Sequence, residues 1–327
     1  GGATRVVMRG AKSIEGDNNA LYVVDGIPLF NTNMGSTDSG IMGEGKAGTE
    51  GIADFNPGDI ESLSVLSGPS AAALYGSDAS NGAIIITTKK GKIGRGVVRY
   101  SNSFRFDEAY QYPKLQTKYD LGMYGMTNYY TQRRFGSQYE PGTVLYDNLK
   151  NFFQTGFSQK HDVSFESGTE AMTFRAGAST TSQTGIVPNS DYKRNNITVA
   201  GTAKLSKWMN IEASMQYAKT ENNKVSRGTG GVLQRAMAWP STDDMREYLN
   251  SAGNIRYPNR YADIDILNPY FDLYKNKNYD EAERFISNLV VNLTPIKDLL
   301  IRGQIGYDVT ASTVEIVRHP QWSSTAT

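Results

Sequence analysis

The side chains best suited to catalysis or tight metal binding are scarce in this sequence. Of its 327 residues two are histidines, His161 and His319, and none is cysteine. Imidazole and thiolate supply most zinc ligands and most nucleophile–base pairs, and neither histidine stands in an HExxH motif. A zinc site would therefore have to be rich in carboxylates, and no metal ion or other cofactor is expected.

The acidic residues around position 50 offer a second kind of chemistry. The sequence places Glu44, Glu50, Asp54, Asp59 and Glu61 close together. Such a group could hold a hard cation or supply an acid and a base for catalysis. The spacing is not that of an EF-hand loop, so a solvated loop face is the favoured interpretation.

Two further groups of residues, one rich in glycine and one of serines, could in principle support nucleotide binding or catalysis. Residues 43–48 read GEGKAG and match GxGxxG, which cradles a pyrophosphate only when a strand precedes it and a helix follows. The flanking segments are NTNMGSTDSGIM and TEGIADFNPG, so a flexible loop is expected. Ser70, Ser77 and Ser80 lie near turns without a G-x-S-x-G elbow, and neither covalent catalysis nor any other enzyme activity is expected.

A polar and aromatic segment follows in the second half of the chain. Its charged residues are Asp243, Asp244, Arg246 and Glu247, and its aromatic residues are Tyr257, Tyr261, Tyr270, Phe271 and Tyr274. Aromatic rings with polar neighbours can bind sugars or peptides by stacking and hydrogen bonding. A loop that packs on its own aromatic residues is an equally good interpretation, and both stay open.

The overall composition narrows the class of function. With 34 basic and 33 acidic residues the net charge is +1, which gives nucleic acid no electrostatic attraction. Apolar residues make up 39%, and no apolar run approaches the roughly 20 residues that a membrane helix needs. A transmembrane β-strand needs only about 10 residues of alternating character, which a hydropathy scan does not detect.

Residues 1–92 form one compositional unit with the features of a small mixed α/β domain. Short apolar runs alternate with turn-rich stretches, and residues 70–75 are typical of a short helical segment. A long polar loop is expected from Asn31 to Glu50. The expected strands are Thr4–Met8, Leu21–Val24, Ile60–Leu66 and Ala83–Thr88.

Beyond residue 92 the sequence alternates between apolar and polar residues, which predicts strands with two different faces. Short turns at residues 205–208 and 294–297 contrast with long connections at 107–160 and 221–282. Aromatic residues near strand ends, Tyr192, Trp208, Tyr217 and Tyr307, suit an interfacial girdle. The expected strands are Val97–Phe106, Asp162–Glu166, Ala171–Thr181, Asn196–Leu205, Trp208–Tyr217, Arg284–Leu293 and Leu299–Val309.

This alternation fits two architectures. A soluble β-sandwich buries its apolar face, whereas a membrane barrel turns that face outward to lipid and keeps a polar interior. Short turns at one end and long loops at the other are typical of outer-membrane barrels. Periodicity alone does not reveal which way the apolar face points.

Three segments carry a family resemblance. The segments are VVMRG, LYVVDGIPL and NPGDIESLSVLSGPSAAALYGSDASNGAIIITTKKGK, within residues 4–92. In order and spacing they closely resemble the plug domain of the SusC/RagA family, which are TonB-linked transporters of Gram-negative outer membranes. The resemblance implies a mixed α/β plug domain at residues 1–92, followed by antiparallel transmembrane β-barrel strands at 93–327. About seven strands are expected, part of a barrel of about 22.

The resemblance also gives the N-terminal residues structural roles. A barrel of this width needs a separate domain to occlude its lumen, and the domain must be polar where it meets the lumen wall. Asp59, Glu61, Lys89, Lys90 and Lys92 suit that surface. The alanines at 71–73 allow close packing of a helix on the plug sheet. Turns with positive φ are expected at Gly26, Gly68, Gly76 and Gly82.

The resemblance implies partners and a transport cycle. A SusD-like surface lipoprotein would cap the barrel and capture an oligosaccharide or a peptide. The inner-membrane TonB–ExbB–ExbD complex, powered by the proton gradient, would pull an N-terminal TonB box and displace the plug. The sequence lacks the TonB box, the small N-terminal domain common in the family and most of the barrel, so a fragment is expected.

The residues that would choose the substrate are the hardest to predict. The loop at 31–50 is expected to face the extracellular cavity, and its candidate substrate contacts are Asn31, Asn33, Asp38 and Glu44. Whether the substrate is a glycan or a peptide stays open. Two other functions also stay open, namely a TonB-linked receptor acting mainly in signalling and a soluble glycan-binding β module.

Overall fold

The computed structural model describes residues 6–8, 10, 18–29, 55–128, 133–228, 230–257 and 267–322. A first group of elements, named here the N-terminal unit, is built on a four-stranded sheet with the order β2-β1-β4-β3. Strand β1 pairs with β4 in parallel, and the other two pairs are antiparallel. The elements are β1 (Leu21–Val24), β2 (Ile27–Leu29), the 3-10 turn η2 (Pro57–Asp59), β3 (Ile60–Leu66), α1 (Gly68–Tyr75), the 3-10 turn η3 (Ser77–Ala79) and β4 (Ala83–Thr88).

Helix α1 packs on this sheet through small side chains. Val23 of β1 and Ala71 of α1 are both fully buried in one cluster. The helix begins after Ser67 with proline in its first turn, where the missing N–H costs no hydrogen bond, and it ends at Gly76 with φ +78°. The expected positive φ is confirmed for Gly26, Gly76 and Gly82 and is wrong for Gly68, because that residue is the first of α1.

The second group of elements is a seven-stranded antiparallel sheet, named here the long sheet, with the order β13-β12-β11-β10-β9-β8-β5. All seven strands expected from alternation are present. Most extend several residues further than the expected ranges toward the ends with long connections. The strands are β5 (Gly94–Asp107), β8 (Gly156–Gly168), β9 (Met172–Thr184), β10 (Asp191–Ser206), β11 (Met209–Asn223), β12 (Lys277–Leu293) and β13 (Ile301–Val317).

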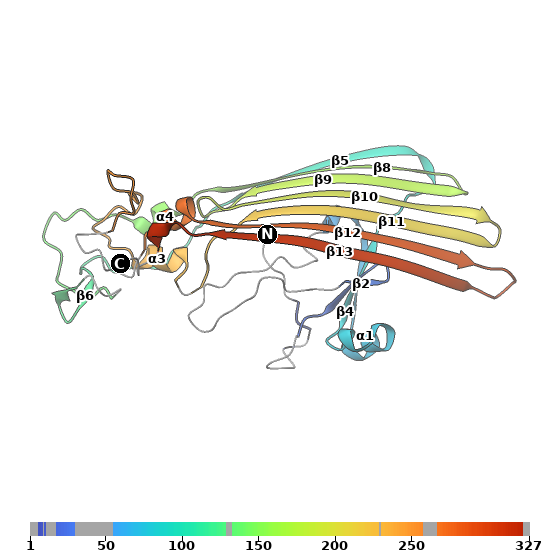
Figure 1. Ribbon diagram of the computed structural model, residues 1–327, viewed down its shortest axis with the longest axis horizontal. Coiled ribbons are helices and arrows are strands. Elements are labelled where there is room, and N and C mark those ends of the chain that lie inside the picture. Colours follow the sequence, from blue (N-terminus) through green and yellow to red (C-terminus); the bar gives the residue numbers. More distant parts are fainter. Residues whose placement is uncertain are drawn as a thin grey trace.

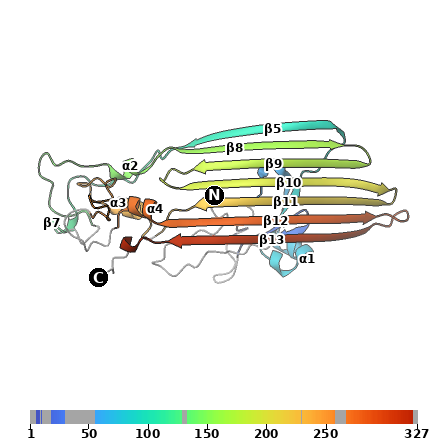
Figure 2. The ribbon, with the colours of Figure 1, turned by 45° about the horizontal axis from the view of Figure 1, so that its top comes forward.

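The two ends of the long sheet differ in their connections (Figure 2). Strands β8 and β9, β10 and β11, and β12 and β13 are joined by short turns at one end. At the other end, long connections join β5 to β8 and β11 to β12. This asymmetry agrees with the one expected from the sequence.

The long connections fold together into a small assembly, named here the loop unit, beyond the end of the sheet (Figure 1). Its largest buried cluster joins α2 to α3 and α4. None of the helices in the described ranges is long and apolar enough to cross a membrane. The elements are the hairpin of β6 (Gly122–Met123) and β7 (Met126–Thr127), α2 (Asn148–Phe152), α3 (Val232–Ala238), α4 (Pro269–Lys275) and the 3-10 turn η4 (Pro320–Trp322).

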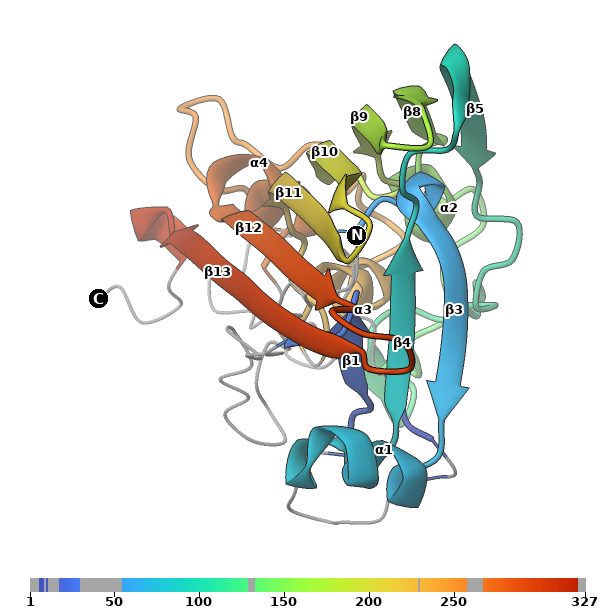
Figure 3. The same ribbon diagram turned by 90° about the vertical axis from the view of Figure 1, so that its right-hand side faces the viewer.

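The long sheet is curved, and the N-terminal unit lies on its concave side. Figure 3 shows the seven strands as an arc with β1, β3 and β4 inside it. The chain passes from one unit to the other between Thr88, the end of β4, and Gly94, the start of β5. The geometry therefore gives the long sheet an inward face toward the N-terminal unit and an outward face on the other side.

Candidate functional site: the contact between the N-terminal unit and the long sheet

The outward face of the long sheet is apolar and exposed. One row of paired outward residues runs across the strands through Val163, Ala178, Ile197, Tyr217 and Phe285. Exposed apolar patches beyond a few hundred Å² are rare on soluble monomers. The exposed large outward side chains of the described strands are Val98, Tyr100, Phe104, Phe106, Val163, Phe165, Met172, Phe174, Ile197, Leu205, Met215, Tyr217, Leu289, Ile301, Ile305, Tyr307, Val309 and Val317.

The outward face changes character toward the loop unit. The next row of paired residues runs through His161, Thr180, Asn195, Lys219 and Glu283. The Lys219 Nζ lies 2.6 Å from a Glu281 carboxylate oxygen, so ion pairs replace the apolar residues there. From β9 to β12 the apolar part of the outward face is thus a band bounded on the loop side by polar and charged residues, whereas on β5 Phe104 and Phe106 continue beyond this row.

The inward face is polar and contacts the N-terminal unit through the 3-10 turn η2. Asp59 is 8% exposed, and its Oδ1 accepts a hydrogen bond from the Arg175 Nη2 at 2.9 Å. The other oxygen of Asp59 accepts from Thr198 Oγ1 at 3.3 Å and from Asn56 Nδ2 at 3.1 Å. Arg175 is itself only 5% exposed, so the ion pair between the two units is buried.

Asn56 ties the same turn to strand β8. Its Oδ1 accepts from the Lys160 Nζ at 2.7 Å, and its Nδ2 donates to the Asp162 carboxylate at 2.5 Å. The same Oδ1 accepts from the Gly58 backbone N–H, which caps the turn. Arg194 donates to the Phe55 carbonyl oxygen at 3.2 Å. These bonds, together with the Asp59 pair, are named here the charged contact.

A second contact, named here the neutral contact, forms at the hairpin turn between β1 and β2. Asp25 and Gly26 both have positive φ, +49° and +88°, as a tight two-residue hairpin turn requires. The Asp25 carboxylate holds this turn by accepting from the Thr88 backbone N–H and hydroxyl. The Asp25 carbonyl oxygen accepts from Gln304 Nε2 at 2.9 Å and from Asn288 Nδ2 at 3.3 Å.

Shape complements hydrogen bonding beside the neutral contact. A Cβ on Gly306 of β13 would overlap the side chain of Ile27 in β2. Glycine at this position is therefore what lets β2 approach the sheet. The main apolar cluster of the N-terminal unit includes Ile286 of β12, which is its one member from the long sheet among the described residues.

The segment that joins the two units is held beside the charged contact. The Lys89 backbone N–H donates to the Asp59 carbonyl oxygen at 2.7 Å, and the Lys89 Nζ donates to the Gly58 carbonyl oxygen at 2.7 Å. Lys90 forms an ion pair with Glu212 of β11. Of the charged residues predicted to face the wall, Asp59 and Lys90 therefore contact the long sheet directly, and Glu61 is exposed.

A narrow cavity of about 30 Å³ separates the charged contact from the neutral contact. Asp59, Arg175 and Thr198 line it on one side, and Asp25 and Asn288 line it on the other. Its remaining wall includes polar residues of β11, namely Ser214 and Gln216. The contact between the units is thus not closely packed along β11.

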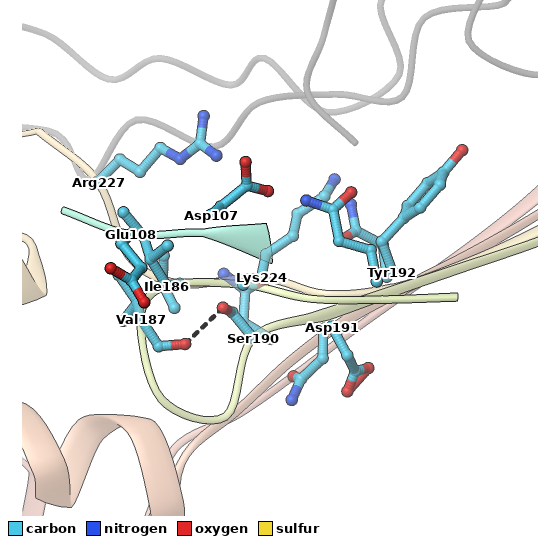
Figure 4. Close-up of a pocket in the computed structure, with 15 residues that line it drawn as sticks. Asp107, Glu108, Ile186, Val187, Ser190, Asp191, Tyr192, Lys224 and Arg227 are labelled. Carbon is cyan, nitrogen blue, oxygen red and sulfur yellow. Dashed lines mark hydrogen bonds between the residues drawn. The ribbon is translucent and has the colours of Figure 1, made fainter. Parts of the chain in front are cut away.

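A larger cavity of about 500 Å³ lies at the loop end of the long sheet. Figure 4 shows Asp107, Lys224 and Tyr192 rising from strand ends on one side, whereas Asp191 points to the opposite side. Lys224 Nζ lies 2.9 Å from Asp280 Oδ1. Tyr192 was predicted to belong to an interfacial girdle, and this is wrong, because it is 7% exposed and lines the cavity. The cavity is lined by Asp107, Glu108, Gln183, Gly185, Ile186, Val187, Ser190, Asp191, Tyr192, Asn222, Asn223, Lys224, Val225, Arg227 and Asn278.

The loop unit next to this cavity has an aromatic core. Phe152, Trp239 and Phe271 are fully buried, and the indole N–H of Trp239 donates to the Asp243 carboxylate at 3.1 Å. Burial raises the pKa of the Tyr270 hydroxyl to about 12. For Tyr270 and Phe271, the structure thus agrees with the interpretation that this segment packs on its own aromatic residues.

Some predicted residues lie elsewhere. The candidate substrate contacts Asn31, Asn33, Asp38 and Glu44 lie outside the described residues, as do Tyr261 and the GEGKAG segment. His161 lies on the outward face of β8, and His319 packs edge-on against Phe271 in the loop unit. The described residues contain no cluster of three or more histidine and carboxylate groups that could hold a metal ion.

Sequence reasoning missed the partners on the long sheet. Arg175, Asn288 and Gln304 were visible only as members of polar faces, because alternation does not say which polar residue meets which. Asp59 was predicted to face a wall, but its partner, 116 positions away in sequence, was not.

Comparison with known proteins gives concordant results. Residues 1–83 match the TonB-dependent Receptor Plug Domain family. The chain is 32% identical to the TonB-dependent receptor SusC of Bacteroides thetaiotaomicron over 98% of its own length and 32% of that protein. It is 23% identical to the TonB-dependent receptor P3 of Formosa agariphila over 94% of its own length and 28% of that protein. The chain thus spans about a third of the length of these curated relatives.

A solved structure shares the fold. The structure titled "RagAB peptide importer in the 'open-open' state" matches 94% of this chain and 36% of that chain. The TM-score is 0.66 at 22% sequence identity. The predicted fold class, a plug domain followed by antiparallel β-strands of a barrel type, is confirmed.

Proposed function

The chain belongs to the SusC/RagA-like TonB-dependent receptors, and from this premise we propose that it forms part of an importer that moves nutrients across the outer membrane of a Gram-negative bacterium. The observation that carries the proposal is the opposite chemistry of the two faces of the long sheet. An apolar face exposed away from the rest of the molecule suits lipid, and a polar face covered by a small domain suits an occluded lumen.

The dimensions of the apolar band support the lipid assignment. Along β12 the outward residues from Leu293 to Phe285 are apolar apart from Ser287, and Glu283 follows. Eight steps of about 3.4 Å give about 27 Å along the strand, and a strand tilt of about 35–45° reduces this to a height of about 19–22 Å, near the roughly 25 Å apolar belt of outer-membrane barrels. The strands continue beyond this band, so their charged ends would stand above the lipid core.

On this proposal the N-terminal unit is the plug. The domain boundary lies between residues 92 and 93, with the plug at 1–92 and the first barrel strands at 93–327. The end of β4 at Thr88 and the start of β5 at Gly94 support this division. Because the plug rests on the wall mainly through polar contacts, it can part from the wall without exposing a large apolar surface to water.

The substrate would meet the chain at the loop end of the lumen. The cavity there offers carboxylates, cations and amides, a mixture that can bind either a glycan or a peptide backbone. We assign to the same mouth the plug-loop residues Asn31, Asn33, Asp38 and Glu44. Alanine substitution of all four, compared with alanine substitution of the exposed plug residues Glu61 and Asp78, tests this by the loss of substrate binding.

Two partners complete the proposal. A SusD-like surface lipoprotein would dock at the loop end, and the TonB–ExbB–ExbD complex would act from the other side through a TonB box. The relatives are receptors and transporters, and their family supports transport over catalysis. Signalling through TonB is the second candidate function. It is retained because the relatives are named TonB-dependent receptors.

Native mass spectrometry of the endogenous complex, extracted in detergent, tests the proposal. Import predicts a longer form of this chain bound to a lipoprotein and to a ladder of ligand masses. Spacing by hexose would identify a glycan importer, and spacing by amino-acid residues would identify a peptide importer. A complex with an anti-sigma factor and no ligand ladder would favour signalling. A monomer that stays in solution without detergent would contradict both import and signalling and would favour the soluble glycan-binding module.

A further inference from the structure

The two contacts between the N-terminal unit and the long sheet are unequal in strength. The charged contact joins three strands of the wall, β8, β9 and β10, and its central residues are buried. It contains an ion pair and further hydrogen bonds to charged groups, which are stronger than bonds between neutral groups. The neutral contact has one carbonyl oxygen and two side-chain amides, and the Gln304 bond is exposed to solvent.

The covalent connection reinforces the stronger side. Lys89 is hydrogen bonded to Asp59 and Gly58, and Lys90 pairs with Glu212, so the tether to β5 runs beside the charged contact. Among the described residues, the β1–β2 hairpin reaches β12 and β13 through the neutral contact, through Ile27 against Gly306 and through Ile286 in the main apolar cluster, and none of these is a covalent tether. Loss of the neutral contact therefore leaves the unit attached at its other side.

The gap between the contacts indicates where a passage would begin. The cavity of about 30 Å³ lies over β11, where the polar residues Thr198, Ser214, Gln216 and Asn288 line it together with the apolar Val24, Ile27 and Ile286. Widening this gap uncovers these few apolar side chains, whereas the polar ones can exchange their hydrogen bonds for bonds to water. Water there also competes for the amide bonds of the neutral contact.

We infer that the N-terminal unit swings about the charged contact, and that the passage opens along the cavity between the β1–β2 turn and strands β11–β13. This inference rests on the proposed import function and specifies the route through it. Asp59 and Arg175 then act as positioning residues that keep the unit attached. Asp25, Asn288 and Gln304 form the side that parts.

Two engineered disulfides in the full-length protein test the route. The 327-residue sequence has no cysteine, so within it the introduced pairs are the only thiols, and any cysteine elsewhere in the full-length protein is first replaced by serine. Ile27→Cys with Gly306→Cys locks the neutral side, where a Cβ at Gly306 would lie 3.2 Å from Ile27 Cγ2, near the roughly 3.5–4.5 Å that a disulfide needs between Cβ atoms. Gly58→Cys with Asp162→Cys locks the charged side, where a Cβ at Gly58 would lie 3.0 Å from an Asp162 carboxylate oxygen.

The measurement is ionic current through the full-length protein in a planar bilayer in KCl, as urea is added to the side of the short turns. The unlocked protein and the Gly58–Asp162 disulfide variant are expected to open at similar urea concentrations. The Ile27–Gly306 disulfide variant is expected to stay closed and to open after reduction. Current through the unlocked protein requires no substrate, partner or TonB. A negative result in this test would therefore contradict the hinge and leave the import proposal unaffected.

Other outcomes overturn the inference. A Gly58–Asp162 lock that stays closed while the Ile27–Gly306 lock opens would reverse the hinge. Two locks that both stay closed would mean that the unit leaves the wall as a whole. Two locks that both open, or an unlocked protein that never conducts, would mean that neither contact gates the passage.

Discussion

The inward and outward faces of the long sheet share one hydrogen-bonded backbone and differ in almost everything else. Met215 and Gln216 are neighbours on β11, yet Met215 is half exposed on the outward side and Gln216 lines the cavity under the N-terminal unit. The outward face has few specific partners, whereas the inward face has buried ion pairs and a glycine shaped for a neighbouring side chain. The outward face is therefore suited to a uniform surrounding medium, whereas the inward face is complementary to one particular domain.

Removing the cation of the buried ion pair should have the largest effect on this comparison. Arg175→Met leaves the Asp59 carboxylate without its charged partner, which costs about 3–5 kcal/mol for buried pairs. With the Ile27–Gly306 disulfide in place, the charged side should then part from the wall at lower urea, as measured by ionic current in a planar bilayer. Arg105→Met, whose side chain is 60% exposed and whose partner Asp107 is 38% exposed, should change little.

A second variant distinguishes the cost of an unpaired Asp59 carboxylate from a general loss of structure. Adding Asp59→Asn to Arg175→Met removes the unpaired charge and should recover part of the lost stability. If the double variant detaches as readily as Arg175→Met alone, the buried charge is not the cause.

A charge on the outward face should have the next largest effect. Met215→Arg lies in the apolar band and should cost about 2–4 kcal/mol of barrel stability near the bilayer midplane. Gln216→Arg, on the adjacent inward position, should cost clearly less. Urea unfolding of the full-length protein in lipid vesicles measures both, and equal losses would mean that the outward face does not meet lipid.

A pair of glycines in β13 sharpens the comparison by shape alone. Gly306→Leu on the inward face should cost about 1–3 kcal/mol, because the new side chain overlaps Ile27. Gly303→Leu on the outward face has no atom within 4 Å of its Cβ and should be nearly neutral. The urea dependence of the ionic current reports the first, and Ile27→Ala should relieve it. A neutral Gly306→Leu would show that β2 does not seat against β13.

The smallest effect is expected beyond both faces, in the loop unit. A hydrogen bond from Arg246 lowers the pKa of the Asp244 carboxyl, so this pair stabilises the unit above the ordinary carboxyl pKa. The contribution is lost as the pH falls through the lowered value. Because the Arg246 side chain is 58% exposed, solvent screens the pair and the loss of stability should be small.

Protease sensitivity of the loop unit against pH measures this contribution, with Asp244→Asn as the control. The substituted protein should lack this component of the pH dependence. An unchanged acid response in Asp244→Asn would assign it to other carboxylates.

The sequence predicted the strands well and their partners poorly. Alternation identified all seven strands, but the predicted ranges stop short of the loop-side end of several of them. Outward positions such as Lys193, Lys219 and Glu281 are polar there, so the contrast between the two faces disappears. The same alternation could not say which face met lipid. That required the N-terminal unit, which covers the polar side.

Local signals also had limits within the N-terminal unit. A turn with positive φ was expected at Gly26, yet the role of this turn as a contact depends on Gln304, which lies 279 positions after Asp25. Gly68 was misassigned, because the Ser-Gly-Pro context begins a helix and does not end a turn. Contacts between distant segments depend on how the units pack, which one-dimensional patterns do not encode.

Spin labels on β11 can determine which face of the long sheet meets lipid and which faces the N-terminal unit. Full-length protein in liposomes would carry a nitroxide at Met215→Cys or at Gln216→Cys, and its collisions with oxygen and with a water-soluble nickel complex would be measured. The Met215 label should collide with oxygen, as in lipid, and the Gln216 label should be shielded from it. A Met215 label shielded from oxygen, or a Gln216 label in lipid, would contradict the assignment of the faces.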